Sequence, residues 1–478
     1  MELRKYVFSV LVSGGGLVAS LATAIFLARS MGPSDYGLLV LSMSIVLLPA
    51  SFVDLGVGVS TPIFLARCLG AKNIANARKI LFDTALFSTV VAILFFLLML
   101  LLLPSIVDIF SMPGLYGGLQ AMIYFIPSIF IQRWGYSALN GLGYNLKKVY
   151  LDRLFGQLIT LIIALYAWTH FETVEAVVAA YGVSMSITGF VACLIGMRAC
   201  LKIDRGKLKA KNEYDFWHLI RHGIPLNLSS VVDRLFKQGD VLIIGLLLSE
   251  TAVGIYSAAF KLVNGVKQLT APISAISAFN ISKSIGEKND KLIFLHYRGA
   301  VLANLFFTGP IYFFLSFEAK NVLKLIYGAE FISGSVPLQI LAIGFSVFVC
   351  IGPLGALLSA LEMNWIRVRV MTFLTALNLV MNYFLVRYFG LEGASMATSM
   401  CFLLLYIAFS RIFPSKDQHF VSPIIILSII FTLNLIGLKV DETGLFHVLY
   451  LVIGMLLLAG VVLMCLNKEI VHKKILEP

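Results

Sequence analysis

Long apolar stretches, each bounded by charged residues, Pro, Gly or Asn, recur along the whole chain. They run for about 18 to 27 residues with few charges, and about 20 apolar residues are enough for a helix to cross a bilayer. The predicted spans are 6–29, 38–60, 80–103, 117–138, 147–169, 174–197, 222–248, 254–280, 292–317, 333–358, 365–388, 391–413, 421–438 and 445–466. The pattern therefore predicts an all-α polytopic membrane protein with about 14 transmembrane helices.

One long polar segment, Arg198 to Arg221, interrupts this series after the sixth span and is rich in Lys and Arg. It predicts a joint between two halves of the chain. The predicted domains are an N-terminal six-helix bundle (1–198), a basic cytoplasmic linker (199–221), a C-terminal six-helix bundle (222–413), and two additional transmembrane helices with a cytoplasmic tail (414–478).

The two halves show short internal matches. A shift of 217 residues places Gly37 on Gly254, and a shift of 219 places Asn145 on Asn364. Six helices per repeat is an even number, so both copies would have the same orientation in the membrane. Parallel repeats of this kind are typical of transporters that bind substrate between their halves. The alternative is that apolar composition alone produces two such matches.

Composition excludes several classes of protein. The chain is 59% hydrophobic and only 13% charged, with a mean hydropathy of +0.93. These values exclude a soluble enzyme, a disulfide-rich secreted domain and an outer-membrane barrel, whose strands alternate in polarity. Six scattered cysteines form no metal or redox motif, and no P-loop, H-E-x-x-H or G-x-S-x-G motif occurs. We therefore expect neither an enzyme nor a bound cofactor.

The positive charge is distributed unevenly between the two sides of the predicted membrane. Of 37 Lys and Arg, 28 fall on the side of the N-terminus, five on the other side, and four within predicted spans. Because Lys and Arg are enriched in cytoplasmic loops, both termini are predicted to be cytoplasmic. This distribution also accounts for the net charge of +12 without a nucleic acid partner.

The charges within spans are the candidates for chemistry, because an ionisable group inside a bilayer is costly. The seventh and eighth spans carry the cations Arg234, Lys237, Lys261 and Lys267, the acids Asp233 and Asp240, and the amides Asn264 and Gln268. At 1.5 Å per residue, Arg234 and Lys267 lie roughly 18 to 20 Å from their helix ends, near the midplane. The acids could simply neutralise the cations, but four cations against two acids leave a surplus. The surplus predicts a site for an anion such as phosphate, with the acids and amides in a supporting role.

Asp54 is the acid that lies well inside a span of the first half, in the sequence D-L-G-V-G-V. Two interpretations stay open. Asp54 takes part in coupling to H+ or Na+, or it caps backbone groups or reaches water beside the neighbouring glycines. The second interpretation, without a part in coupling, is favoured.

Several motifs together resemble a known family. They are A-R-S-M-G-P-S-D-Y-G (Ala28 to Gly37), D-L-G-V-G (Asp54 to Gly58), D-R-L-F-K-Q-G-D (Asp233 to Asp240), V-G-I-Y-S-A-A-F-K-L-V (Val253 to Val263), L-I-Y-G-A-E-F-I-S-G-S-V-P-L-Q-I-L-A (Leu325 to Ala342) and F-G-L-E-G-A-S-M-A-T (Phe389 to Thr398). Their order and spacing resemble the O-antigen-type oligosaccharide flippases of polysaccharide biosynthesis, in the multidrug/oligosaccharidyl-lipid/polysaccharide exporter superfamily.

The resemblance implies a flippase of the bacterial inner membrane. Its substrate would be an undecaprenyl-pyrophosphate-linked oligosaccharide, moved to the outer leaflet by alternating access that an ion gradient drives, with a polysaccharide polymerase and chain-length proteins as further partners. A drug or cation antiporter of the same fold and a lipid II flippase stay as alternatives. The cationic surplus disfavours the antiporter, and the short outer loops disfavour a glycan polymerase or ligase.

Overall fold

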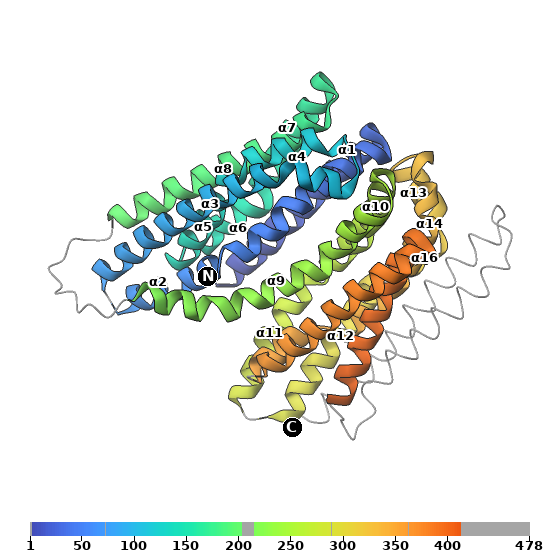
Figure 1. The fold of residues 1–478 in the computed structure, drawn as a ribbon. Coiled ribbons are helices and arrows are strands. Elements are labelled where there is room, and N and C mark those ends of the chain that lie inside the picture. The colour runs from blue at the N-terminus through green and yellow to red at the C-terminus, as the bar shows by residue number, and fades with distance from the viewer. Residues whose placement is uncertain (1, 72, 203–214, 288, 362, 413–478) are drawn as a thin grey trace. The chain divides into compact units, whose positions relative to one another are not determined.

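The computed structural model describes residues 2–71, 73–202, 215–287, 289–361 and 363–412, and the regular elements in these ranges are all helical (Figure 1). The chain forms two compact units, Met1–Gly254 and Ile255–Pro478. The first unit contains α1 (Glu2–Val53), α2 (Val57–Gly70), α3 (Ile74–Phe110), α4 (Leu115–Tyr124), α5 (Ile126–Gly141), α6 (Asn145–Val149), the π-helix η1 (Tyr150–Phe155), α7 (Gly156–Phe171), α8 (Val174–Lys202), α9 (Phe216–Leu247) and the start of α10 (Glu250–Gln268).

The second unit contains the remainder of α10 and the helices that follow it. These are α11 (Ala271–Gly286), α12 (Asp290–Phe317), α13 (Ala319–Ile326), the 3₁₀ helix η2 (Ala329–Gly334), α14 (Ser335–Cys350), α15 (Leu354–Ala360) and α16 (Asn364–Ile412).

Seven helices in the described ranges are long and apolar enough to cross a membrane, or eight if the bent pair α4 and α5 is one span. This confirms a multi-pass membrane protein. Two long helices change direction at a glycine, α1 at Gly32 and α16 at Gly390. Each glycine lies between two predicted spans, so the change of direction agrees with the predicted boundary. The total of fourteen stays a prediction, and the predicted spans 421–438 and 445–466 lie outside the described residues.

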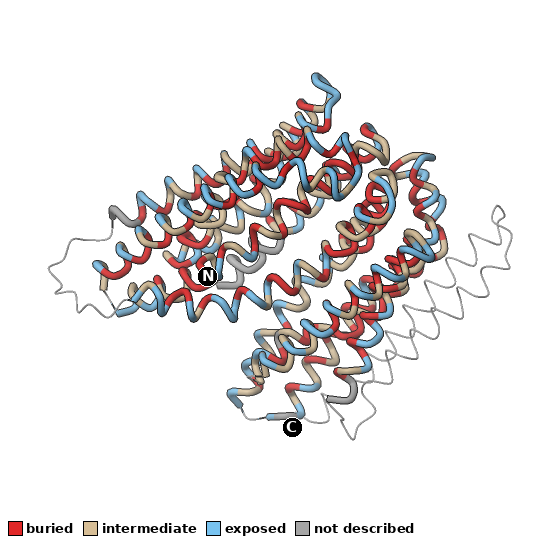
Figure 2. The backbone as a smooth tube through the Cα atoms, in the orientation of Figure 1, coloured by how far each residue is buried: buried red, intermediate tan, exposed pale blue. Residues whose placement is uncertain are grey.

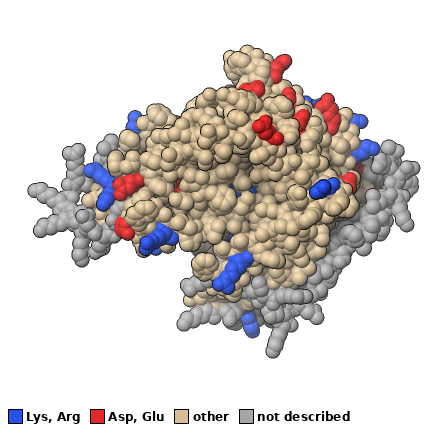
Figure 3. Space-filling model, viewed as in Figure 1, with Lys and Arg blue, Asp and Glu red and all other residues tan. Residues whose placement is uncertain are grey.

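The helix α3 shows how the apolar pattern is used. Its large exposed side chains recur every three or four residues on one face, whereas its opposite face buries small or polar residues such as Thr84, Ser88 and Ala92. The exposed set is Phe82, Leu86, Val90, Ile93, Leu94, Leu97, Leu98, Leu101, Leu102 and Ile109. A face of this kind suits lipid and not water. Much of the visible surface of the molecule is likewise uncharged (Figure 3).

The structure corrects the sequence prediction at four places where a single span was expected. The span 38–60 breaks after Val53, and the span 117–138 bends by 46° at Phe125. The span 254–280 breaks at Leu269–Thr270, and the span 333–358 breaks after Cys350. Two of the helices that resume, α5 and α11, carry Pro in their first turn, where its missing N–H costs nothing. The apolar run continues through each break, so hydropathy alone could not reveal it.

Within the first unit, α5 packs against α2, α3 and α8, while α1 packs against α4, α7 and α9. Buried and exposed stretches alternate along each of these helices (Figure 2). The sequence assigns α9 to the second bundle, but in the structure this helix packs on α1 and α2. The predicted domain ranges themselves stay predictions, and most of the predicted linker lies outside the described residues.

The second unit has its own apolar core. The helix α14 packs between α12 and α16, and α11 packs against α12 and α15. Its core includes fully buried Leu305, Phe313 and Leu358. Tyrosine hydroxyl groups tie α10 into this unit: Tyr312 donates to the Val263 carbonyl at 3.1 Å and Tyr327 to that of Ala258 at 3.3 Å.

Candidate functional site

A break in the membrane-spanning backbone forms the centre of the candidate site. Between α1 and α2 the chain turns through Leu55 and Gly56, both of which have positive φ (47° and 82°). The backbone here approaches α9 so closely that a Cβ on Gly56 would lie 2.1 Å from the Gly223 carbonyl oxygen. Gly56 therefore serves both the left-handed turn and the close contact.

Each end of the broken helix has a charged side chain of opposite sign to its dipole. Asp54 Oδ2 accepts a hydrogen bond from Gly58 N at 3.0 Å, in the first turn of α2. Arg133 of α5 donates to the Ala50 carbonyl at 2.8 Å and to that of Leu47 at 3.5 Å, in the last turns of α1. A carboxylate at a helix N-terminus and a guanidinium at a C-terminus are both favourable. Asp54 thus holds the first turn of α2 through this hydrogen bond, and its part in ion coupling stays a prediction.

Further polar contacts fix the same region. Asn227 of α9 donates to the Ser51 carbonyl at 2.9 Å, and Ser137 of α5 donates to the Gly58 carbonyl. In hydrocarbon, each backbone carbonyl left without a partner would be costly, so α5 and α9 supply the missing partners. The break is therefore held by side chains from two neighbouring helices.

A cavity of about 460 Å³ lies beside this break, within the first unit. Its lining residues are Leu47, Ser51, Asp54, Gly58, Val59, Pro62, Ile129, Gln132, Arg133, Tyr136, Ser137, Asn140, Lys148, Asp152, Met185, Asn227, Ser230 and Arg234. Its volume is in the range of small-molecule sites, but its lining is far more polar than the membrane around it. Irregular backbone and ionisable side chains in a membrane protein are tolerated where they line such a cavity.

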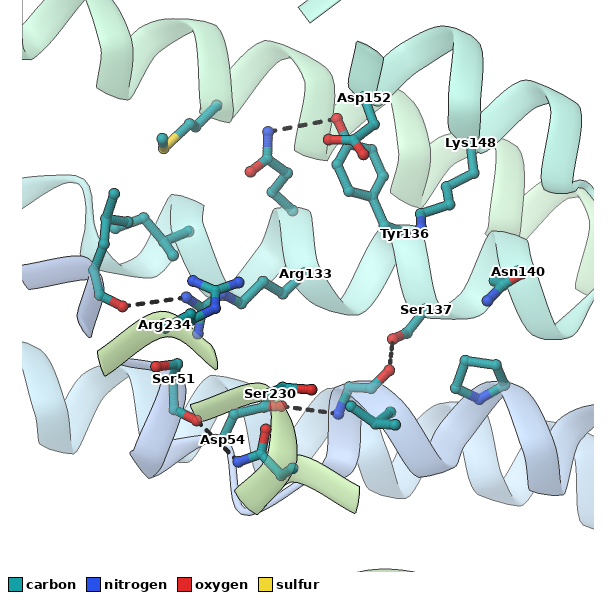
Figure 4. A pocket seen from close by; sticks show the side chains of 18 residues that line it. Ser51, Asp54, Arg133, Tyr136, Ser137, Asn140, Lys148, Asp152, Ser230 and Arg234 are labelled. Atoms are coloured by element: carbon teal, nitrogen blue, oxygen red, sulfur yellow. Dashed lines mark hydrogen bonds between the residues drawn. The ribbon is translucent and has the colours of Figure 1, made fainter. Parts of the chain in front are cut away.

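Two arginines from different helices face one end of the cavity (Figure 4). Arg133 comes from α5 and Arg234 from α9, and both lie near Asp54. Arg133 donates its hydrogen bonds to carbonyls of α1, whereas Arg234 makes no hydrogen bond or ion pair among the described residues. Two cations and one carboxylate leave this end with a formal charge of +1, which suits an anion. We call Asp54, Arg133 and Arg234 the arginine end.

The opposite end of the cavity carries Tyr136, Asn140, Lys148 and Asp152 (Figure 4). Lys148 belongs to α6 and Asp152 to η1, whereas Tyr136 and Asn140 belong to α5. The charges of Lys148 and Asp152 balance each other. This end is therefore polar but formally neutral.

The residues proposed from the sequence fall into two groups. Arg234 and Asp54 share the cavity, while Lys237, Asp233 and Asp240 lie on the same helix as Arg234 but do not line it. Lys261, Asn264, Lys267 and Gln268 belong to the second unit, where Lys267 Nζ lies 4.0 Å from the centre of the Phe348 ring. That all four cations act in one site stays a prediction.

Arg133, Lys148 and Asp152 line the cavity but are not among the site residues predicted from the sequence. Arg133 and Lys148 count among the 28 cations on the N-terminal side, although Arg133 falls inside the predicted span 117–138. Its position within an apolar run was the signal that could have identified it. Lys148 and Asp152 lie near a predicted helix end, where the sequence gives no comparable signal.

Known proteins resemble this chain in sequence and in fold. Residues 3–280, more than half of the chain, match the family described as "Polysaccharide biosynthesis protein". The chain is 26% identical over 220 residues to the probable low-salt glycan biosynthesis flippase Agl15 of Haloferax volcanii (strain DS2). That match covers 45% of each protein, so the chain spans about half the length of this relative.

Two further matches extend over more of the chain. It is 22% identical over 348 residues to the putative O-antigen transporter of Escherichia coli (strain K12), covering 71% of this chain and 79% of that one. Its fold is similar to that of lipid II flippase MurJ in the inward closed conformation, with a TM-score of 0.73 and 15% identity over 97% of this chain and 100% of that one. These relatives are named as transport proteins, in agreement with the prediction that the chain is not an enzyme.

Proposed function

The chain belongs to the polysaccharide biosynthesis protein family, and from this membership and the arginine end we propose that it is a flippase for a lipid-linked oligosaccharide. It would carry an undecaprenyl-pyrophosphate-linked repeat unit from the cytoplasmic to the outer leaflet of the bacterial inner membrane. The product would serve the assembly of a surface polysaccharide such as O-antigen, capsule or exopolysaccharide. A polysaccharide polymerase and chain-length proteins would act on it next.

The observation that carries this proposal is the pair Arg133 and Arg234 beside a cavity in the membrane-spanning part of the first unit. Pyrophosphate is the charged group of such a substrate, and arginine binds phosphate oxygens through several N–H donors at once. Arg133 is held by two carbonyls and positions the site, while Arg234 supplies the donors that face the cavity. The relatives named as a glycan flippase and an O-antigen transporter support the glycan part of the proposal.

The remaining parts of the proposal concern orientation and energy. Both termini would be cytoplasmic, as the 28 cations on one side of the predicted spans indicate. Transport would proceed by alternating access coupled to H+ or Na+. Lys237, Lys261 and Lys267 would add positive charge along the path of the pyrophosphate, and Asp233, Asp240, Asn264 and Gln268 would support them.

The alternatives make different demands on the cavity. A lipid II flippase would use the same pyrophosphate chemistry, and the fold resembles one. A drug or cation antiporter would need an acidic cavity, and the formal charge of the arginine end opposes that. A transport assay with defined lipid-linked substrates distinguishes the proposed flippase from a lipid II flippase. Inhibition of transport by cationic dyes would indicate a drug or cation antiporter.

The test is complementation of a deletion strain. We expect Arg234→Gln to abolish surface glycan display and to leave the undecaprenyl-linked oligosaccharide accumulated on the inner leaflet. Arg221→Gln is the matched control, because Arg221 lies exposed on the same helix and does not line the cavity. Full glycan display with Arg234→Gln, at normal protein levels, would show that the arginine end is not the anion site.

A further inference from the structure

The cavity extends along α5 well beyond the two arginines. Arg133, Tyr136, Ser137 and Asn140 line it at the helical spacing i, i+3, i+4 and i+7, so they share one face of α5. At 1.5 Å per residue, the seven residues from Arg133 to Asn140 cover about 10 Å along the helix. A phosphate group at Arg234 would occupy only one end of this length.

The chemistry of the other end is unsuited to a second phosphate. An ionised carboxylate such as that of Asp152 only accepts hydrogen bonds, and so does an ionised phosphate oxygen. Sugar hydroxyl groups both donate and accept, so they can donate to Asp152 and accept from Lys148. The Asn140 amide can do either. This set of side chains therefore favours a neutral group rich in hydroxyls.

The backbone fixes Asp152 in this position. Asp152 lies in η1, a π-helical turn inside the span Asn145–Phe171, and such turns occur often at functional sites. The turn is seated on α1: a Cβ on Gly16 would lie 1.8 Å from the Arg153 carbonyl oxygen. Only glycine permits this contact, so α1 and η1 are locked together at this point.

The neighbouring Arg153 makes no hydrogen bond to the Asp152 carboxylate. Arg153 Nε lies 3.7 Å from Asp152 Oδ2, which is longer than a hydrogen bond. The Arg153 side chain is 59% exposed, and an exposed pair of this kind contributes little. Asp152 therefore keeps acceptor capacity toward the cavity.

From this arrangement we propose that Asn140, Lys148 and Asp152 form a sugar subsite, which binds the sugar residue attached directly to the phosphate. This subsite deepens the proposed function and rests on it, since the phosphate would be held at Arg234. The ligand of the cavity is then a glycosyl phosphate and not a phosphate alone. The rest of the oligosaccharide and the lipid would lie outside the cavity.

The test compares two kinds of phosphate monoester on the purified full chain in nanodiscs. Isothermal titration would use methyl phosphate, which lacks a sugar, and the 1-phosphates of glucose, galactose, mannose and N-acetylglucosamine. We expect at least one sugar phosphate to bind about tenfold more tightly than methyl phosphate, equivalent to about 1.4 kcal/mol. We expect Asp152→Ala to remove this preference and to leave the affinity for methyl phosphate the same or slightly higher.

Two variants separate the subsite from the proposed function. Arg234→Gln should weaken binding of methyl phosphate and sugar phosphates together, while Asp108→Asn, an exposed acid on α3, should change neither. If no sugar phosphate exceeds methyl phosphate, or if the preference survives in Asp152→Ala, the sugar subsite is wrong. If Arg234→Gln leaves both affinities unchanged, the anion site and with it the proposed function fail instead.

Discussion

Gly37 of α1 and Gly254 of α10 lie backbone to backbone, each against the other's helix. A Cβ on Gly37 would fall 1.8 Å from the Glu250 carbonyl oxygen, and a Cβ on Gly254 would fall 1.9 Å from that of Pro33. The shift of 217 residues that pairs Gly37 with Gly254 also pairs Pro33 with Glu250. The contact is therefore reciprocal, because each glycine meets the carbonyl of one residue of the pair Pro33 and Glu250. The repeat itself stays a prediction.

This contact leads to a prediction for Gly37→Ala. The added methyl group cannot fit below 2 Å from a backbone carbonyl, so α1 and α10 must separate. We expect a loss of stability of about 1 to 3 kcal/mol, as for other overpacked sites. The measurement is the apparent melting temperature of the purified protein in detergent, together with glycan display in the complementation strain.

Gly14→Ala is the control for this change. Gly14 lies on the same helix, and a Cβ there would meet nothing within 4 Å. Because alanine has the higher helix propensity, this variant should keep or slightly raise the melting temperature. Equal behaviour of the two variants would mean that the close contact of Gly37 has no structural importance.

The two arginines of the cavity should respond differently to substitution. Arg133→Ala removes the hydrogen bonds to the Leu47 and Ala50 carbonyls, and a hydrogen bond to a charged group contributes about 1.5 to 3 kcal/mol. We therefore expect Arg133→Ala to lower the melting temperature by several degrees. Arg234→Ala should leave it nearly unchanged and abolish phosphate binding, because Arg234 has no comparable contacts. A stable, binding-competent Arg133→Ala protein would contradict the positioning role of Arg133.

The sequence predicted the multi-pass helical fold because lipid-facing helices such as α3 need large apolar residues on their outer faces. It also singled out Arg234, which lines the cavity, because a charge inside an apolar run is conspicuous. It did not predict the break between α1 and α2 at Asp54, since the residues around the break are as apolar as those of a continuous membrane-spanning helix. Nor did it predict the cavity: the proximity of Arg133, Asp152 and Arg234 depends on how α5, η1 and α9 pack, and no local pattern encodes that.

Asp54 allows its two interpretations to be separated by experiment. If it acts as a cap for α2, Asp54→Asn should retain most of the transport, since asparagine also accepts a hydrogen bond from Gly58 N. Asp54→Ala should then lose about 0.5 to 2 kcal/mol of stability. We expect this pattern in thermal unfolding and in a vesicle transport assay. Wild-type stability of Asp54→Asn combined with complete loss of gradient-driven transport would instead establish ion coupling.

Lys267 tests whether the second unit contributes to the anion path. Its ammonium group lies 4.0 Å from the centre of the Phe348 ring, a cation–π distance, so its position is defined. If it adds positive charge along the path of the pyrophosphate, Lys267→Gln should reduce the transport rate several-fold, and Lys267→Arg should restore much of it, since arginine keeps the charge and also stacks on aromatic rings. Lys324→Gln, an exposed lysine on α13, is the control. Initial rates in proteoliposomes give the measurement. Unchanged rates in Lys267→Gln would exclude Lys267 from the path of the pyrophosphate, because removing this cation would then have no effect on the moving charge.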